Sequence, residues 1–219
     1  MAKKRKVGNL MALAVLSVMV DRPMHRYEIA ATLRARGKDC DMDIKWGSLY
    51  TVVRNLAKAG FLEVVGSERE GARPERVIYR ITEAGRAEMV DWTRELIAEP
   101  EPERGRFTAG LSILAALPPD EVIELFGRRL AALTEQITAV RAELEQLESS
   151  LPRLFLVETY YGLAMLEAEA AWTQSMRDEL AAGTFPGQDQ WRDWHSGGEP
   201  PQLGEHGEGG TAPERETKR

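Results

Sequence analysis

The chain has 219 residues, of which 43% are hydrophobic and 29% charged, and its formal net charge is −6. This composition is typical of globular proteins and excludes fibrous and wholly disordered chains. The longest apolar run, residues 10–20, is about half the ~20 residues of a membrane-spanning helix, so we expect a cytoplasmic protein without a membrane span. The single cysteine, Cys40, excludes an internal disulfide and any Cys-x-x-Cys metal site.

The charge is distributed unevenly along the chain. Residues 1–92 contain 17 Lys and Arg against 12 Asp and Glu, a net charge of +5, whereas residues 93–219 contain 12 against 23, a net charge of −11. The field that an anionic partner meets is that of the domain it touches, so the basic first part suits nucleic acid. The alternative is a chance excess of cations combined with an acidic tail.

Proline and glycine divide the chain into five expected parts. Alternating Pro and Glu after residue 98 favours an extended linker, and the last 37 residues contain too few aliphatic side chains to offset the entropy of ordering. The expected parts are a basic flexible leader (1–8), a mixed region (9–98), a linker (99–106), a helical region (107–182) and a disordered tail (183–219).

The mixed region begins with two expected helices. The first spans residues 9–20, where apolar residues occupy nearly every side, so it should be buried. Pro23 can open the second helix at its first turn, where the missing N–H of proline costs nothing. Ile29 and Leu33 give this second helix an inner face, and it should end near Gly37.

A third helix is expected over residues 47–59, because Gly60 follows it as a C-terminal signal and its apolar residues share one face. Two alternating segments, residues 62–67 and 76–82, then predict a β-hairpin with an arginine-rich tip. Thr82 should cap a fourth helix. Three helices followed by such a hairpin form a winged helix-turn-helix, which places its second motif helix, here residues 47–59, in the DNA major groove.

The polar face of the third helix, the residues before it and the hairpin are therefore predicted to contact DNA phosphates and base edges. The alternative is that Arg54 and Lys58 form an ordinary solvated helix face, but the arginines of the hairpin beside them favour DNA. The candidate residues are Lys45, Ser48, Tyr50, Thr51, Arg54, Asn55, Lys58, Arg69, Arg73 and Arg76.

Four short motifs carry a family resemblance. Residues 22–29, 47–50, 73–74 and 79–85 read RPMHRYEI, GSLY, RP and YRITEAG. Each motif alone is a weak signal, but in this order and spacing, on the elements expected above, they are specific. From residue 10 to about residue 185 the sequence resembles the PadR family of transcriptional regulators.

The resemblance implies roles for individual residues. Tyr50 matches a contact to the DNA backbone or a base edge, and Arg73 and Arg76 match the basic wing of the family. His25 and Tyr27 match the motif of the second helix, where we expect them to position the helix. Two departures stand out: Arg26 replaces a glycine usual in the family and Thr51 replaces a proline, which changes the first turn of the recognition helix.

The helical region contains a strict heptad seam, which requires a partner helix. The seam consists of Leu130, Leu133, Ile137, Val140, Leu144, Leu147 and Leu151. Pro152 ends this helix, and a second one is expected over residues 153–182. The partner is either that second helix in the same chain or a second copy. The resemblance implies a homodimer, with the seven seam residues as its predicted interface, which would present two recognition helices to a pseudo-palindromic operator.

Aromatic residues on the last expected helix are candidates for an effector pocket. Family members respond to small aromatic or hydrophobic compounds, and by that resemblance Phe155, Tyr161 and Trp172 are the candidate residues, with Trp172 foremost. The alternative is that this aromatic stripe packs in a core.

No enzyme motif is present: the sequence has no GxGxxG, P-loop, HExxH or GxSxG, and we expect no catalytic residues, metal or cofactor. The cations at residues 3–6 are interpreted as a flexible arm for DNA phosphate.

The predicted fold class is mainly α with a small β-hairpin wing, an N-terminal winged helix-turn-helix followed by a C-terminal helical hairpin or coiled-coil dimerisation domain. We predict a homodimeric PadR-like repressor of transcription that a small molecule releases from double-stranded DNA. The alternative is a winged-helix module that binds another protein through its heptad helix.

Overall fold

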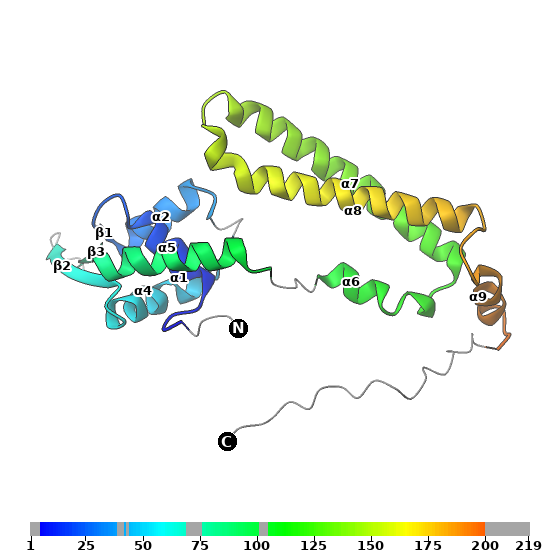
Figure 1. Cartoon of the computed structure of the whole chain (residues 1–219), viewed down its shortest axis with the longest axis horizontal. Helices are drawn as coiled ribbons and strands as arrows, with labels where there is room; N and C mark the ends of the chain where they lie inside the picture. The colour runs from blue at the N-terminus through cyan, green and yellow to red at the C-terminus, as the bar shows by residue number, and fades with distance from the viewer. Residues whose placement is uncertain (1–4, 39–41, 43, 69–75, 101–104, 200–219) are drawn as a thin grey trace, which may run out of the picture. The chain divides into compact units, whose positions relative to one another are not determined.

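A computed structural model describes residues 5–38, 42, 44–68, 76–100 and 105–199. The chain divides into two compact units, Met1–Glu103 and Arg104–Arg219. The described residues are mainly helical with one small antiparallel sheet (Figure 1), which confirms the predicted fold class. Within these residues no helix combines the length and the apolar character that crossing a membrane requires.

The first unit contains the expected helices and hairpin, together with one additional strand. In chain order its elements are α1 (Leu10–Val18), β1 (Met24–His25), α2 (Arg26–Ala35), a 3-10 turn (Trp46–Ser48), α4 (Leu49–Lys58), β2 (Leu62–Glu68), β3 (Arg76–Ile81) and α5 (Glu83–Ala98). The three strands form an antiparallel sheet in the order β1-β3-β2.

The expectation that Pro23 opens α2 is wrong. Met24 and His25 instead pair with Tyr79 and Ile78 of β3, so a short strand separates the proline from the helix. His25 then caps α2: its Nδ1 accepts a hydrogen bond from the backbone N–H of Glu28 at 3.3 Å, and the Glu28 carboxylate accepts one from the backbone N–H of His25 at 3.0 Å. This capping box fixes where α2 begins.

The core of the first unit forms around α1, whose residues 11–16 and Val18 are all buried, as expected for a helix that is apolar on nearly every side. Thr82 caps α5 as predicted, because its hydroxyl accepts a hydrogen bond from the backbone N–H of Gly85 at 3.0 Å. A Cβ at Gly85 would overlap the carbonyl oxygen of Phe61, so only glycine allows α5 to approach the β2 end this closely.

The leader is docked where the structure describes it, and the expectation of a flexible arm is wrong for Arg5. The Arg5 guanidinium donates to the Glu88 carboxylate at 2.7 Å and to the Glu95 carboxylate, and it lies 5.1 Å from the centroid of the Trp92 ring. With Asp91, whose carboxylate lies 3.6 Å from the guanidinium, four side chains of α5 thus hold this cation. A run of four cations looks solvated in sequence, because the acidic partners lie more than 80 residues away.

The second unit is built on a long helical hairpin. Its elements are α6 (Arg106–Leu111), a 3-10 turn (Leu114–Ala116), α7 (Pro119–Glu148), a second 3-10 turn (Arg153–Leu156), α8 (Val157–Ala181) and α9 (Gln188–His195). The helices α7 and α8 lie side by side along most of their length (Figure 1). Arg129 of α7 donates from Nε to the Glu169 carboxylate of α8 at 2.8 Å, which joins the two helices.

The heptad seam lies within this hairpin. Leu133 and Leu144 are buried in the single chain, four further seam residues are half-buried, and Leu151 at the end is exposed. Because α8 is the helix that runs along α7, the seam finds its partner helix in the same chain. Of the two alternatives that periodicity left open, the intramolecular pair therefore accounts for the burial of the seam.

The tail is ordered where the structure describes it, so the expectation of disorder is wrong for residues 183–199. Trp191 of α9 is buried against Val122, Phe126 and Leu180, and its Nε1 donates to the Leu117 carbonyl at 2.9 Å. Trp191 and Trp194 supply the apolar area that orders α9, although the segment as a whole is rich in glycine and proline. Residues 200–219 lie outside the described residues.

Candidate nucleic-acid interface

The helix α4 is amphipathic in the manner that the sequence predicts. Leu49, Val52, Val53 and Leu56 are buried in the core of the first unit. The opposite face is exposed and consists of Tyr50, Thr51, Arg54, Asn55 and Lys58. A helix of this length is about 15 Å long, and the major groove of B-DNA is about 12 Å wide, so α4 can lie in the groove with this face towards the bases.

The exposed face of α4 carries positive charge that no ion pair among the described residues neutralises. The sequence of α4, LYTVVRNLAK, contains no acidic residue. Among the residues that the structure describes, neither Arg54 nor Lys58 forms an ion pair, whereas Arg80 of β3 is paired with Glu63 at 2.8 Å and Arg36 is paired with Asp21. The two α4 cations are therefore available to an anionic partner.

Of the two candidate residues before α4, Lys45 has an exposed side chain and Ser48 has a hydrogen-bonded one. Lys45 is exposed, and it adds a third cation at the N-terminal end of the helix. Ser48 is half-buried, and its hydroxyl donates to the Lys45 carbonyl at 2.8 Å. Ser48 therefore positions the turn that begins α4, and its hydroxyl is less free for another partner than the predicted role assumed.

The hairpin is described only in part. The strands pair in antiparallel register, with Glu68 opposite Arg76, and a bulge between Val64 and Gly66 shifts the register. The structure thus places the backbone of Arg76 at the outer end of β3. The tip predicted to contact DNA, with Arg69 and Arg73, lies outside the described residues.

One group near α4 was not among the candidate residues. Arg26, the first residue of α2, lies with its guanidinium carbon 4.8 Å from the ring centroid of Tyr27 and 5.1 Å from that of Tyr50. Its Nη2 donates to the Tyr27 hydroxyl at 2.9 Å. We call these three residues the Arg26 stack. The only sign of this group in the sequence was that an arginine stands where the family that the sequence resembles usually has a glycine.

The pKa of Glu28 is lowered below its ordinary value of 4.5, mainly because its carboxylate accepts the hydrogen bond from the His25 backbone N–H. The hydrogen bond and charge of Arg22 lower it further and outweigh the opposing effect of burial. Glu28 is therefore ionised at neutral pH, and the start of α2 stays capped.

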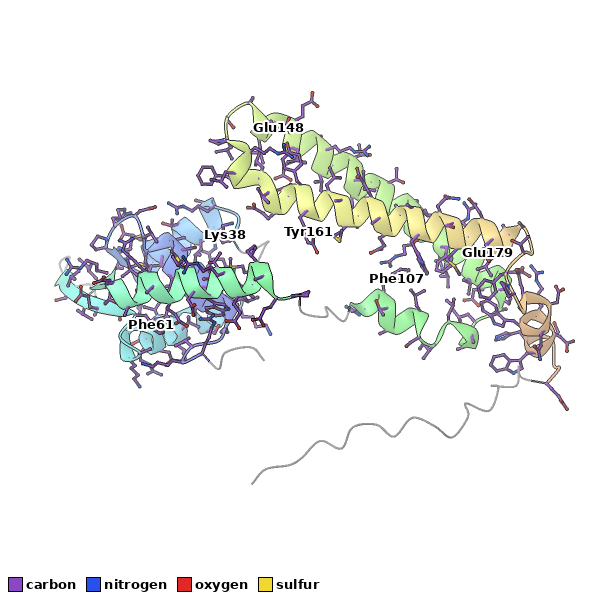
Figure 2. All side chains as sticks on the ribbon, viewed as in Figure 1. Lys38, Phe61, Phe107, Glu148, Tyr161 and Glu179 are labelled. Atoms are coloured by element: carbon purple, nitrogen blue, oxygen red, sulfur yellow. The ribbon has the colours of Figure 1, made fainter. Side chains whose placement is uncertain are left out.

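The three candidate effector residues do not converge in one chain. Phe155 and Tyr161 are exposed near the start of α8, and Tyr161 lies on the side turned away from α7 (Figure 2). Trp172 lies about 25 Å further along than Phe155 by helical rise, and it makes edge contacts with Phe107 and Phe126 at centroid distances of 5.9 and 6.2 Å. Across the described residues no group of three or more His, Cys, Asp or Glu is placed to hold a metal ion.

Comparison with known proteins agrees with this geometry. Residues 15–91 match the model of the transcriptional regulator PadR-like family. A probable transcriptional regulator of Mycobacterium tuberculosis, Rv1176c, is 26% identical over 157 residues, which cover 68% of this chain and 72% of that protein.

The fold also resembles solved structures over about four fifths of the chain. Bacillus subtilis PadR in complex with operator DNA is 18% identical, with a TM-score of 0.64 over 78% of this chain and 99% of that chain. The same protein in complex with p-coumaric acid is 19% identical, with a TM-score of 0.64 over 79% of this chain and 99% of that chain. Because they cover more of this chain than the first unit contains, these likenesses reach into the second unit, and they show a common fold. Over residues 15–91, this chain is thus similar to the PadR-like family of transcriptional regulators.

Proposed function

We propose that this protein is a homodimeric transcriptional repressor that binds a pseudo-palindromic DNA operator through α4 and the hairpin. The observation that carries the proposal is the exposed face of α4, where two cations without an ion pair among the described residues stand among hydroxyl, amide and phenol groups, on a helix whose other face is buried. Arginine and lysine bind phosphates and guanine edges, and asparagine binds adenine, so this face combines affinity with sequence reading.

The predicted DNA contacts follow from this placement. Arg54, Asn55 and Lys58 project from the exposed face of α4, and Tyr50 and Thr51 lie in its first turn, which contacts base edges in a helix-turn-helix. Lys45 and the hairpin arginines Arg69, Arg73 and Arg76 are assigned to flanking phosphates. These phosphate contacts would make affinity depend steeply on salt.

Homodimerisation is assigned to α8. The α7 seam is occupied within the chain, but α8 carries large apolar side chains that are exposed at helical spacing: Val157, Tyr161, Met165 and Trp172. These four residues, the α8 stripe, lie within about 80° of one another around the helix axis, so they form one continuous face. A contiguous apolar face of this kind is typical of an interface. A two-fold dimer would place its half-sites about one turn of DNA apart.

Release by a small aromatic compound is the last part of the proposal. Bacillus subtilis PadR has been solved with p-coumaric acid, and in this chain Trp172 already contacts two phenylalanine rings that could exchange for a ligand ring. Titration of the protein with phenolic acids should quench tryptophan fluorescence and weaken operator binding together. Unchanged fluorescence and unchanged affinity would remove the effector from the proposal.

Charge reversal in α4 tests the DNA-binding part. We expect Arg54→Glu to weaken binding to the operator by at least about 100-fold, because it replaces an attractive contact with a repulsive one. The matched control is Arg128→Glu, since Arg128 is an exposed arginine of α7 with no ion pair among the described residues. Equal affinity of Arg54→Glu and the unchanged protein would favour the protein-interaction module instead.

Sedimentation tests the dimer. The unchanged protein should have about twice the 24.5 kDa mass of one chain, and Tyr161→Glu, which introduces a charge into the α8 stripe, should sediment as a monomer. The control Gln136→Glu introduces the same charge at an exposed position of α7 and should remain dimeric. A monomeric unchanged protein would contradict the assignment of α8.

A further inference from the structure

The Arg26 stack is a preformed, exposed cationic group beside the N-terminus of α4. Tyr27 and Tyr50 are 59% and 52% exposed, so the guanidinium lies against two aromatic rings at the surface of the first unit. A planar guanidinium that stacks on rings keeps its N–H edge free. Of its five N–H donors, one is used by the Tyr27 hydroxyl.

Stabilisation of α2 does not explain why an arginine stands at position 26. The positive end of the helix dipole lies at the first turn, so a cation at the first helical residue is on the unfavourable end. The cap of this helix is complete without Arg26, because His25 and Glu28 bond to each other's backbone and Arg22 donates to Glu28 at 3.0 Å. Within the part of the chain that the structure describes, Arg26 has no carboxylate partner. Among these residues nothing neutralises its charge, which lies at the unfavourable end of the helix dipole.

The stack joins the two helices of the DNA-binding motif at the ends that meet DNA. In a helix-turn-helix the first helix crosses the phosphate backbone, and the N-terminal residues of the second contact base edges. Arg26 is the first residue of α2, and Tyr50 is the second residue of α4. Arg26 is thus suited to a phosphate at the edge of the groove, while its contact restricts the Tyr50 ring.

From this arrangement we infer that Arg26 binds a backbone phosphate in each operator half-site and, through the same stack, holds Tyr50 in position for a base edge. The inference rests on the proposed DNA binding and adds a residue to it. Arginine forms paired hydrogen bonds with phosphate oxygens, so one contact fixes both the position and the orientation of the stack. The pair Arg26 and Tyr50 would then set the register of α4 in the groove.

Salt dependence of binding separates a phosphate contact from a packing role. The full-length protein is titrated with a duplex that it has selected from a random pool, at several salt concentrations. Loss of one phosphate contact per half-site in Arg26→Gln should reduce the slope of log affinity against log salt by about 0.9 per half-site, or about 1.8 for a dimer. Affinity near ~0.15 M salt should fall by at least about tenfold.

Two further variants complete the test. Arg26→Lys keeps the charge and should keep the slope, and the control Arg128→Gln should match the unchanged protein in slope and affinity. Helical circular dichroism and melting temperature of each variant show whether it folds.

Three results would overturn the inference. If the unchanged protein binds its duplex and Arg26→Gln has the same slope, Arg26 does not contact phosphate, although DNA binding stands. If Arg26→Gln weakens binding without changing the slope, the stack has only a packing role. If the unchanged protein selects no duplex at all, the proposed function fails together with this inference.

Discussion

Replacing Arg5 tests whether the start of the chain is part of the first unit. The Arg5 side chain is 3% exposed, and it is held by Glu88, Glu95 and the Trp92 ring. Burial alone would lower the pKa of Arg5, but the hydrogen bonds and charges of Glu88 and Glu95 outweigh it and raise the pKa, so the residue stays cationic. Arg5→Met removes the charge and keeps much of the apolar volume.

The expected loss of stability follows from these contacts. Each hydrogen bond between charged groups contributes about 1.5–3 kcal/mol and the contact with the Trp92 ring about 1 kcal/mol. Glu88 and Glu95 keep 16% and 19% of their side-chain surface exposed, so water rehydrates them in part once Arg5 is gone. We therefore expect the free energy of unfolding of this unit to fall by about 2–3 kcal/mol.

Hydrogen exchange of the α1 backbone amides measures this loss without a two-state assumption for the whole chain. A loss of 2–3 kcal/mol corresponds to exchange that is about 30- to 160-fold faster. The control Lys6→Met removes a neighbouring cation whose Nζ lies 6.0 Å from the Phe61 ring centroid on an exposed side chain, and it should change exchange little. Exchange rates in Arg5→Met within about twofold of those in the unchanged protein would refute the claim that docking of Arg5 stabilises the first unit.

Three further predictions concern caps and packing. Glu28→Gln should lower stability by about 1 kcal/mol at pH 7. Since the folded pKa of Glu28 is depressed, the advantage of the unchanged protein should disappear as the pH falls below 4.5 through that pKa. Denaturant titrations at pH 7 and at a pH below that pKa check this. Gly85→Ala should cost more than about 3 kcal/mol because its Cβ overlaps the Phe61 carbonyl, whereas Gly66→Ala, which meets no atom within 4 Å, should cost less than about 1 kcal/mol in the same unfolding assay. Trp191→Ala should cost about 3–5 kcal/mol and expose α9 to protease, and an undigested α9 would contradict its docking through Trp191.

Local patterns predicted the helices of the first unit, because each of these helices has a sequence signal within a few residues. Such signals are the helical spacing of the apolar residues around Leu56 in α4, the apolar run of α1 and the cap at Thr82, and the structure has all three. The strand β1 has only two residues, too few for a periodicity, so it could be recognised only from its pairing with β3. Composition averaged over the tail concealed Trp191, whose burial orders α9.

The candidate interface was likewise predictable only where a local pattern defines it. The exposed face of α4 follows from helical periodicity, because burial of one face defines the other. The Arg26 stack could not be predicted, since it depends on how closely the start of α2 approaches the start of α4, which is a property of the folded unit. The docking of Arg5 on α5 was missed for the same reason.

Selection of duplex DNA from a random pool by the purified full-length protein, at about 0.15 M salt, tests the central claim most directly. At this ionic strength non-specific attraction to phosphate is partly screened, so enrichment reports sequence reading. The account predicts an inverted repeat whose half-sites lie about one helical turn apart. Recovery of no motif, with binding that disappears as salt is raised, would contradict it.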